Sequence, residues 1–128
     1  MKIGMTFEQK ICVEEHMLAS SMGSGEVDVL ATPFMIAKME QTSSLCVAQE
    51  IGEGNVTVGI LVNVTHISPT PLGMNVKFVS ELTEVDGKIL TFKVQAFDDQ
   101  GKIGEGTHTR AIVNKEKFQT RAKAKGTV

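Results

Sequence analysis

Alternation of apolar and polar residues runs through much of the chain and predicts β-strands. The clearest run is Val56–His66, in which every second residue up to Val64 is apolar and β-branched. This pattern is typical of a long strand with one buried face. Shorter runs predict four more strands, at Met5–Glu14, Met74–Thr83, Leu90–Phe97 and Lys102–Val113. Turn signals at Ser68–Gly73, Asp86-Gly87 and Asp98–Gly101 indicate that the last four strands form an antiparallel meander.

One segment, Thr32 to about Ile51, has the features of a helix. Thr32 and Pro33 are interpreted as N-cap and first helical residue, because the threonine oxygen can accept a backbone N–H and proline fits a position without a donor. Glu40 shares a helix face with apolar or small residues, namely Ile36, Ala37, Ser43, Ser44 and Val47. A carboxylate on such a face must be partnered or neutralised, which makes Glu40 a functional candidate.

The order of these elements predicts a single α+β domain over residues 1–128, with one long helix against an antiparallel sheet. The segment between His16 and Val29 is expected to be a loop that ends in a short extended piece. Because one helix covers little of a sheet, we expect another face or an edge of the sheet to meet a second subunit. The sequence therefore favours a homodimer.

Composition narrows the possible partners and location. A formal net charge of −2 gives no basic surface for nucleic acid or anionic membranes, and the basic tail from Arg121 to Val128 is expected to be frayed. No apolar run reaches the roughly 20 residues that span a bilayer, and the N-terminus lacks the apolar middle of a signal peptide, so a cytoplasmic location is expected. Cys12 and Cys46 are interpreted as buried thiols, and no metal or cofactor is expected.

Three residues form a candidate catalytic set: Thr32, Glu40 and His66. A hydroxyl, a carboxylate and an imidazole can supply a positioning hydrogen bond, a nucleophile or general base, and a proton donor to a leaving group. Each also has a structural explanation. Thr32 can be a helix cap only, Glu40 can turn to solvent or pair with a lysine, and His66 can be a satisfied histidine at a strand end.

Two further segments, around Gly59 and from Gly104 to Arg110, contain residues that could contact a ligand. Gly59 interrupts the alternating strand, where it can leave space for a ligand or let the helix approach. Gly104 and Gly106 are interpreted as bulge positions. Arg110 can bind a phosphate or carboxylate, or it can be solvated or paired within the protein. The chain has neither a Gly-x-Ser-x-Gly elbow nor an HExxH motif, which argues against a serine hydrolase or a zinc enzyme.

The chain resembles the hotdog-fold acyl-CoA thioesterases, in particular the fluoroacetyl-CoA thioesterase branch. The resemblance is carried by three stretches: ATPFMIAKME at the helix start, the THxxxTPxG pattern from Thr65 to Gly73, and GxGTHxR from Gly104 to Arg110. It implies a sheet wrapped around a central helix, and a homodimer or dimer of dimers with active sites at the subunit interface. It further implies catalytic roles for Thr32, Glu40 and His66, and a substrate pocket that includes Gly59 and Arg110.

By the same resemblance, Glu40 would attack the thioester carbonyl or activate water, Thr32 would orient it, and His66 would assist proton transfer at the sulfur. Whether His66 serves the Glu40 of its own chain or that of a partner stays open. The segment Met17–Leu30 has no aromatic residue, whereas fluoroacetyl-specific members carry phenylalanines there, so a short- or medium-chain acyl-CoA is the expected substrate. A noncatalytic acyl-CoA-binding module and an acyl-CoA hydratase are the alternatives.

Overall fold

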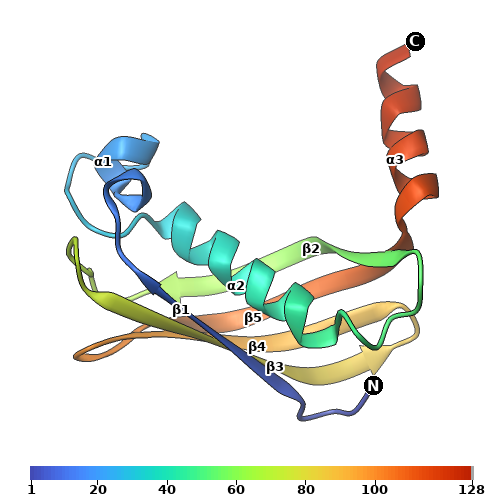
Figure 1. The fold of residues 1–128 in the computed structure, drawn as a ribbon, viewed down its shortest axis with the longest axis horizontal. Helices are drawn as coiled ribbons and strands as arrows, with labels where there is room; N and C mark the ends of the chain where they lie inside the picture. Colours follow the sequence, from blue (N-terminus) through green and yellow to red (C-terminus); the bar gives the residue numbers. More distant parts are fainter. Residues whose placement is uncertain (128) are drawn as a thin grey trace.

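A computed structural model of the protein describes residues 1–127 and shows a helix, α2 (Thr32–Val47), lying across one face of a five-stranded antiparallel sheet (Figure 1). The strands follow the order β1-β3-β4-β5-β2 across the sheet. Their bounds are β1 (Thr6–Cys12), β2 (Asn55–His66), β3 (Asn75–Asp86), β4 (Ile89–Asp98) and β5 (Gly101–Asn114). The predicted α+β architecture is confirmed. The predicted meander of four strands is wrong for β2, because β2 pairs with β5 and not with β3, and only β3, β4 and β5 form a meander.

The core lies between α2 and the concave side of the sheet. Helix α2 contributes Met35, Met39, Cys46 and Val47, all buried. They belong to one cluster with buried residues of the central strands, including Phe78, Leu82, Leu90, Phe92, Val94, Ala96 and Ile103. Each large apolar side chain removed from water in this way contributes about 1.5–3 kcal/mol. This packing fixes the position of α2 over the sheet and therefore the position of the polar groups that α2 carries.

The start and the end of α2 differ from the prediction. Ala31 occupies the N-cap, without a side-chain hydrogen bond, and Thr32 is the first helical residue. The hydroxyl of Thr32 is instead bonded to His66, which explains why it does not cap the helix. Pro33 still fits its place, because the N–H groups of a first turn have no partner within the helix. The helix ends at Val47, and the residues up to Glu50 form a turn rather than another helical turn.

The segment before α2 is more ordered than the predicted loop. It contains a single 3-10 turn, η1 (Glu15–Met17), and a short helix, α1 (Ala19–Met22). The predicted extended piece appears as two isolated bridges, Leu18 to Leu30 and Val29 to Pro71. Of the two cysteines, Cys46 is buried as predicted, whereas Cys12 is exposed because it lies on the edge strand β1.

Strand β2 forms an edge of the sheet, and this changes its expected burial. Ile60, Leu61 and Val62, in the middle of the strand, are 54%, 58% and 36% exposed. The prediction of one continuous buried face is therefore wrong for the single chain. The register with β5 also shifts between Gly59 and Leu61, so Ile60 is an extra residue in a β-bulge.

A third α-helix, α3 (Lys115–Ala124), follows β5, and it includes residues from Arg121 on that the sequence analysis expected to be frayed. Asn114 caps it, since its side-chain oxygen accepts a hydrogen bond from the Lys117 backbone N–H at 3.0 Å. A last 3-10 turn, η2 (Lys125–Thr127), follows, and Val128 lies outside the described residues. In the part of the chain that the structure describes, no helix is long and apolar enough to cross a membrane.

Candidate active site

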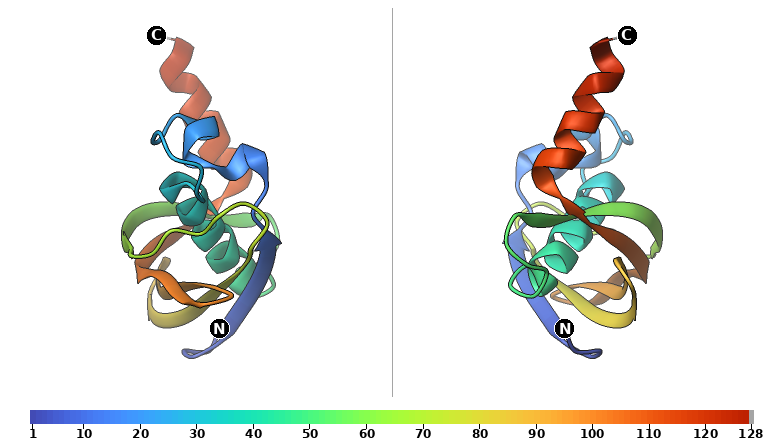
Figure 2. Two further views of the ribbon diagram at one scale, coloured as in Figure 1. Left: turned by 90° about the vertical axis from the view of Figure 1, so that its left-hand side faces the viewer. Right: turned by 90° about the vertical axis from the view of Figure 1, so that its right-hand side faces the viewer.

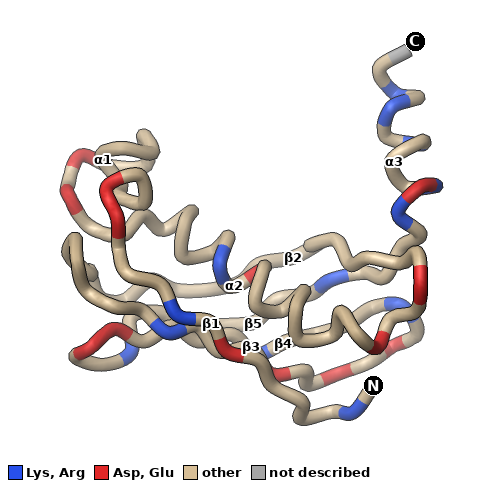
Figure 3. The backbone as a smooth tube through the Cα atoms, viewed as in Figure 1, with Lys and Arg blue, Asp and Glu red and all other residues tan. Residues whose placement is uncertain are grey.

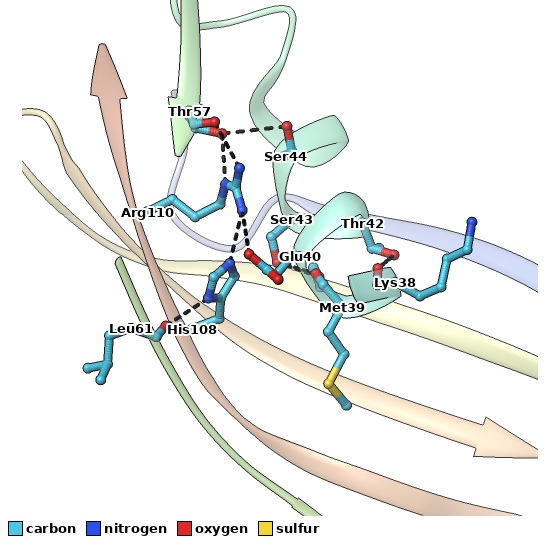
Figure 4. Close-up of polar contacts among 11 residues, drawn as sticks. Lys38, Met39, Glu40, Thr42, Ser43, Ser44, Thr57, Leu61, His108 and Arg110 are labelled. Carbon is cyan, nitrogen blue, oxygen red and sulfur yellow. Dashed lines mark hydrogen bonds and ion pairs between the residues drawn. The ribbon is translucent and has the colours of Figure 1, made fainter. Parts of the chain in front are cut away.

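Two residues of β5, His108 and Arg110, point toward α2 and anchor a buried polar network (Figure 4). They share a face because side chains two apart in a strand lie on the same side. The Arg110 guanidinium donates from Nε to Oγ1 of Thr57 at 2.8 Å and from Nη2 to the Thr57 carbonyl at 2.8 Å. Burial lowers the pKa of Arg110, whereas Glu40 acts in the opposite direction. The guanidinium keeps its charge, because arginine stays protonated in proteins.

Glu40 reaches this network from α2. Its Oε2 lies 3.7 Å from Nη1 of Arg110, and its side chain is 40% exposed while that of Arg110 is 9% exposed. The Glu40 carboxylate thus faces the Arg110 guanidinium on one side and solvent on the other. This arrangement holds a charged carboxylate at the surface of the sheet, where a substrate can approach it.

Gly59 provides the space for this carboxylate. A Cβ atom built on Gly59 would lie 2.6 Å from Oε2 of Glu40 and 3.2 Å from Cε1 of His108. The backbone of Gly59 does not have a positive φ, so the need for glycine is one of space and not of conformation. Any larger residue at position 59 would contact the Glu40 carboxylate.

Gly104 and Gly106, two of the three glycines in β5, were interpreted as bulge positions. A Cβ on Gly104 would lie 2.7 Å from Sδ of Met35, which means that Gly104 lets α2 approach the sheet. A register shift does lie next to Gly104, at Ile103, but Gly106 pairs regularly with Val64. The interpretation of Gly106 as a bulge position is therefore wrong.

His108 is a residue of the network to which the sequence analysis gave no role. Nδ1 lies 2.8 Å from the Leu61 carbonyl, to which it can only donate, so Nε2 is left to accept from Nη1 of Arg110 at 3.2 Å. Burial lowers the pKa of His108, while the Leu61 carbonyl raises it and the Arg110 charge lowers it. The neutral imidazole thus fixes one N–H of Arg110 beside Glu40. The sequence signal for this role is that His108 lies two residues before Arg110 in a predicted strand, which places both side chains on the same face.

A second cluster joins the start of α2 to the end of β2. Oγ1 of Thr32 and Nδ1 of His66 are 2.7 Å apart. Nε2 of His66 is buried and, among the described residues, has no hydrogen-bond partner. Burial also lowers the pKa of His66, an effect that the backbone at Ser68 partly opposes. A buried ring nitrogen without a partner is costly and marks a place where a substrate atom can bind.

The five sequence-predicted residues therefore fall into two groups. Glu40, Gly59 and Arg110 lie together, and Thr32 lies with His66. Glu40 follows Thr32 by eight positions in α2, which corresponds to about 12 Å along the helix axis. Within one chain, the two groups therefore lie at different places along α2.

A pocket of about 330 Å³ adjoins the second cluster. Its walls come from α1, from the loop that follows it and from the end of β2, and they include Ala19, Ser24, Gly25, Val27, Val29, Leu30, Thr32, His66, Ile67, Ser68 and Pro69. Among these described residues there is no Phe, Tyr or Trp. The pocket is thus built from small and aliphatic side chains.

Residues 13–116 match the family model described as fluoroacetyl-CoA-specific thioesterase. The chain belongs to the fluoroacetyl-CoA thioesterase family. It is 33% identical to the fluoroacetyl-CoA thioesterase of Streptantibioticus cattleyicolor over 98% of this chain and 94% of that protein. As a member of this family, the protein is a thioester hydrolase that acts on acyl-CoA.

Solved structures agree with this family assignment. A structure of the fluoroacetyl-CoA thioesterase FlK superimposes with a TM-score of 0.92 at 33% identity, covering 98% of this chain and 97% of that one. A Thermus thermophilus member of the thioesterase superfamily shares the fold at 23% identity, with a TM-score of 0.91 over 98% of this chain and 93% of that one. A hot-dog-like protein from Thermanaerovibrio acidaminovorans also shares it, at 20% identity and a TM-score of 0.87 over 96% and 91% of the chains. The expected hotdog fold is confirmed.

Proposed function

We propose that the protein hydrolyses short- or medium-chain acyl-CoA thioesters to a free acid and CoA, with Glu40 as nucleophile or general base. The observation that carries this proposal is the setting of Glu40. Its carboxylate is open to solvent on one side, faces the buried Arg110 at 3.7 Å and has no side chain at Gly59 in its way. A fixed carboxylate of this kind can take a proton from water or add to a carbonyl carbon.

His66 is the proton donor in this proposal. When Nδ1 accepts a hydrogen bond from the Thr32 hydroxyl, the single proton of the neutral ring lies on Nε2. Nε2 is the buried nitrogen without a partner, so it can donate to the sulfur of a bound thioester. Thr32 is then a positioning residue that selects the tautomer. The orientation by Thr32 acts on His66 within the chain, rather than on Glu40 as the resemblance implied.

The atoms balance in either route for Glu40. As a general base, Glu40 takes a proton from water while the water oxygen bonds to the acyl carbon. The C–S bond then breaks, and the departing sulfur receives the proton of His66 Nε2. As a nucleophile, Glu40 forms an anhydride with the acyl group, the thiol leaves by the same proton transfer, and water cleaves the anhydride. In both routes a proton taken from water then returns to Nε2 of His66 and Glu40 is again a free carboxylate, so that one water is consumed and one acid and one CoA are released.

In this proposal the two clusters meet across a dimer. β2 is an edge strand whose Ile60, Leu61 and Val62 are exposed, and an unprotected apolar edge invites pairing with a second chain. A twofold axis at the middle of β2 makes the strands antiparallel and brings the partner's His66 toward the Glu40 half of the first chain. The homodimer then has two shared sites.

Mixed dimers test whether the site is shared. Chains with Glu40→Gln and chains with His66→Ala should each be nearly inactive alone. When the two are co-expressed in equal amounts, half of the dimers are mixed and each mixed dimer has one intact site, so about a quarter of the parent activity should return. Thiol release by the purified mixture measures this. Activity no higher than that of the single variants would mean that Glu40 and His66 of the same chain act together.

The substrate range follows from the pocket beside His66. Because its described lining has no Phe, Tyr or Trp to close over a two-carbon group, we expect turnover of acyl groups longer than acetyl and no preference for fluoroacetyl. Thiol release from CoA esters graded from acetyl to long chains, with fluoroacetyl included, measures both points. A fluoroacetyl preference would contradict the pocket argument, which rests on the residues that one chain contributes to the lining.

The same assay separates the alternatives. A noncatalytic binding module would return the esters intact after long incubation. A hydratase would consume the double bond of an enoyl-CoA without releasing thiol. Either result would overturn the proposed hydrolysis.

A further inference from the structure

Helix α3 stands away from the body of the molecule (Figure 1). No residue of this ten-residue helix is buried. A helix of this length is marginal in water by itself, and helices in proteins gain most of their stability by packing an apolar face. We therefore expect α3 to pack against a surface that its own chain does not supply.

One side of α3 is suited to such packing. Phe118 and Ala122 lie one turn apart, and Arg121 and Lys125 flank them. These four residues, called the docking face below, line a hollow of about 370 Å³. Phe118 is 38% exposed and is one of the large hydrophobic residues at the surface of the molecule. The docking face thus combines an apolar centre with positive charge.

The position of α3 points to a second copy of the chain as its partner. Asn114, the N-cap of α3, pairs with Asn55 at the start of β2. In both views of Figure 2, α3 inclines toward the side of the molecule that carries β2. A chain paired antiparallel along this edge has the His66 end of its own β2 beside Asn55 of the first chain. The docking face of one chain would then lie next to the pocket of the other.

The rim of that pocket complements the docking face. Val27 and Ile67 line the pocket and are 60% and 58% exposed, so they offer an apolar surface to Phe118. Glu26 and Asp28 flank Val27 and give this loop negative charge, whereas α3 is mostly basic (Figure 3). Opposite charges around an apolar contact favour one docked orientation.

We propose that α3 docks across the dimer on the pocket rim of the partner subunit, with Phe118 covering the mouth of the partner's acyl pocket. Arg121 and Lys125 then face the acidic loop that carries the partner's Val27. Each subunit would thereby supply a residue to the pocket of the other. This inference rests on the dimer proposed above, and it adds an interaction surface to it.

Engineered cysteines test the contact directly. In a Cys12→Ser background, the pair Phe118→Cys and Ile67→Cys, or Phe118→Cys and Val27→Cys, should give a covalent dimer on mild oxidation, and each single cysteine should not. A bond within one chain cannot form, because the twelve residues of β2 hold the two ends roughly 35 Å apart. A protein that sediments as a dimer but gives no cross-link with either pair would overturn the docking of α3 alone. A monomer would overturn the proposed dimer as well.

Two matched variants test what the contact does. Phe7 and Phe118 are both 38% exposed, but Phe7 lies on β1 at the opposite edge of the sheet. Phe118→Ala should raise the dissociation constant of the dimer at least about 10-fold and raise KM at concentrations that keep the protein dimeric. Phe7→Ala should change neither quantity. Equal effects of the two variants would overturn the proposal.

Charge reversal gives an independent check. Glu26→Lys with Asp28→Lys should weaken the dimer, and adding Arg121→Glu with Lys125→Glu should restore it. A loss without restoration would mean that these charges do not face each other, which contradicts the proposed orientation.

Discussion

Glu40→Gln is expected to lower kcat/KM for thiol release by at least about 10³-fold, because the amide can neither accept a proton from water nor add to a carbonyl carbon. The substitution keeps the size of the side chain and leaves an amide oxygen to accept from Arg110, so the fold should be retained. Far-ultraviolet circular dichroism and sedimentation would verify this, and thiol release from an acyl-CoA ester gives the rate.

Glu53→Gln is the matched control for this prediction. Glu53 is exposed in the turn before β2 and has no place in the network, so its replacement should leave kcat/KM unchanged. If Glu40→Gln retains more than about a tenth of the parent rate, Glu40 does not act in proton transfer or nucleophilic attack. The dimer and the docking of α3 would be unaffected by that result, because neither depends on the carboxylate.

Gly59→Ala is expected to lower kcat by about 10²-fold without unfolding the protein. The new methyl group would lie 2.6 Å from Oε2 of Glu40, closer than any real contact, so the carboxylate must move. A displacement of about 1 Å in a reacting group can cost this much in rate. Since Gly59 is exposed and has no positive φ, alanine is accommodated by the backbone. Thiol release and thermal unfolding would be measured together.

Gly126→Ala is a suitable control, because a Cβ at Gly126 meets nothing within 4 Å and this glycine also lacks a positive φ. It should leave the rate unchanged. Rescue gives a sharper check: Glu40→Asp, whose shorter side chain withdraws from the methyl group, should recover part of the activity lost in Gly59→Ala. A Gly59→Ala protein that is fully active would show that the Glu40 carboxylate has no fixed position.

The local elements of this fold could be predicted because their causes are local. Period-two alternation around Val56–His66 predicts a strand, and the turn residues Asp86-Gly87 predict a hairpin, without any knowledge of tertiary contacts. Glu40 was recognisable as unusual because three- and four-residue spacing alone puts it among apolar neighbours. The GxGTHxR and THxxxTPxG patterns, read as a resemblance, gave the family and the hotdog fold. Even so, Thr32 was taken for the cap that it is not, because its actual hydrogen-bond partner lies 34 residues away.

What the sequence by itself determined is therefore the set of strands, the central helix and the residue types that can do chemistry. Only the tertiary structure decided which of those residues meet. It placed Arg110 beneath Glu40 and His108 beside Arg110, whereas it put Thr32 and His66 at the other end of β2. It also made β2 an exposed edge and left α3 without a buried face. Periodicity reports which side of an element is apolar, but contacts between distant segments depend on strand order and packing, which no local pattern encodes.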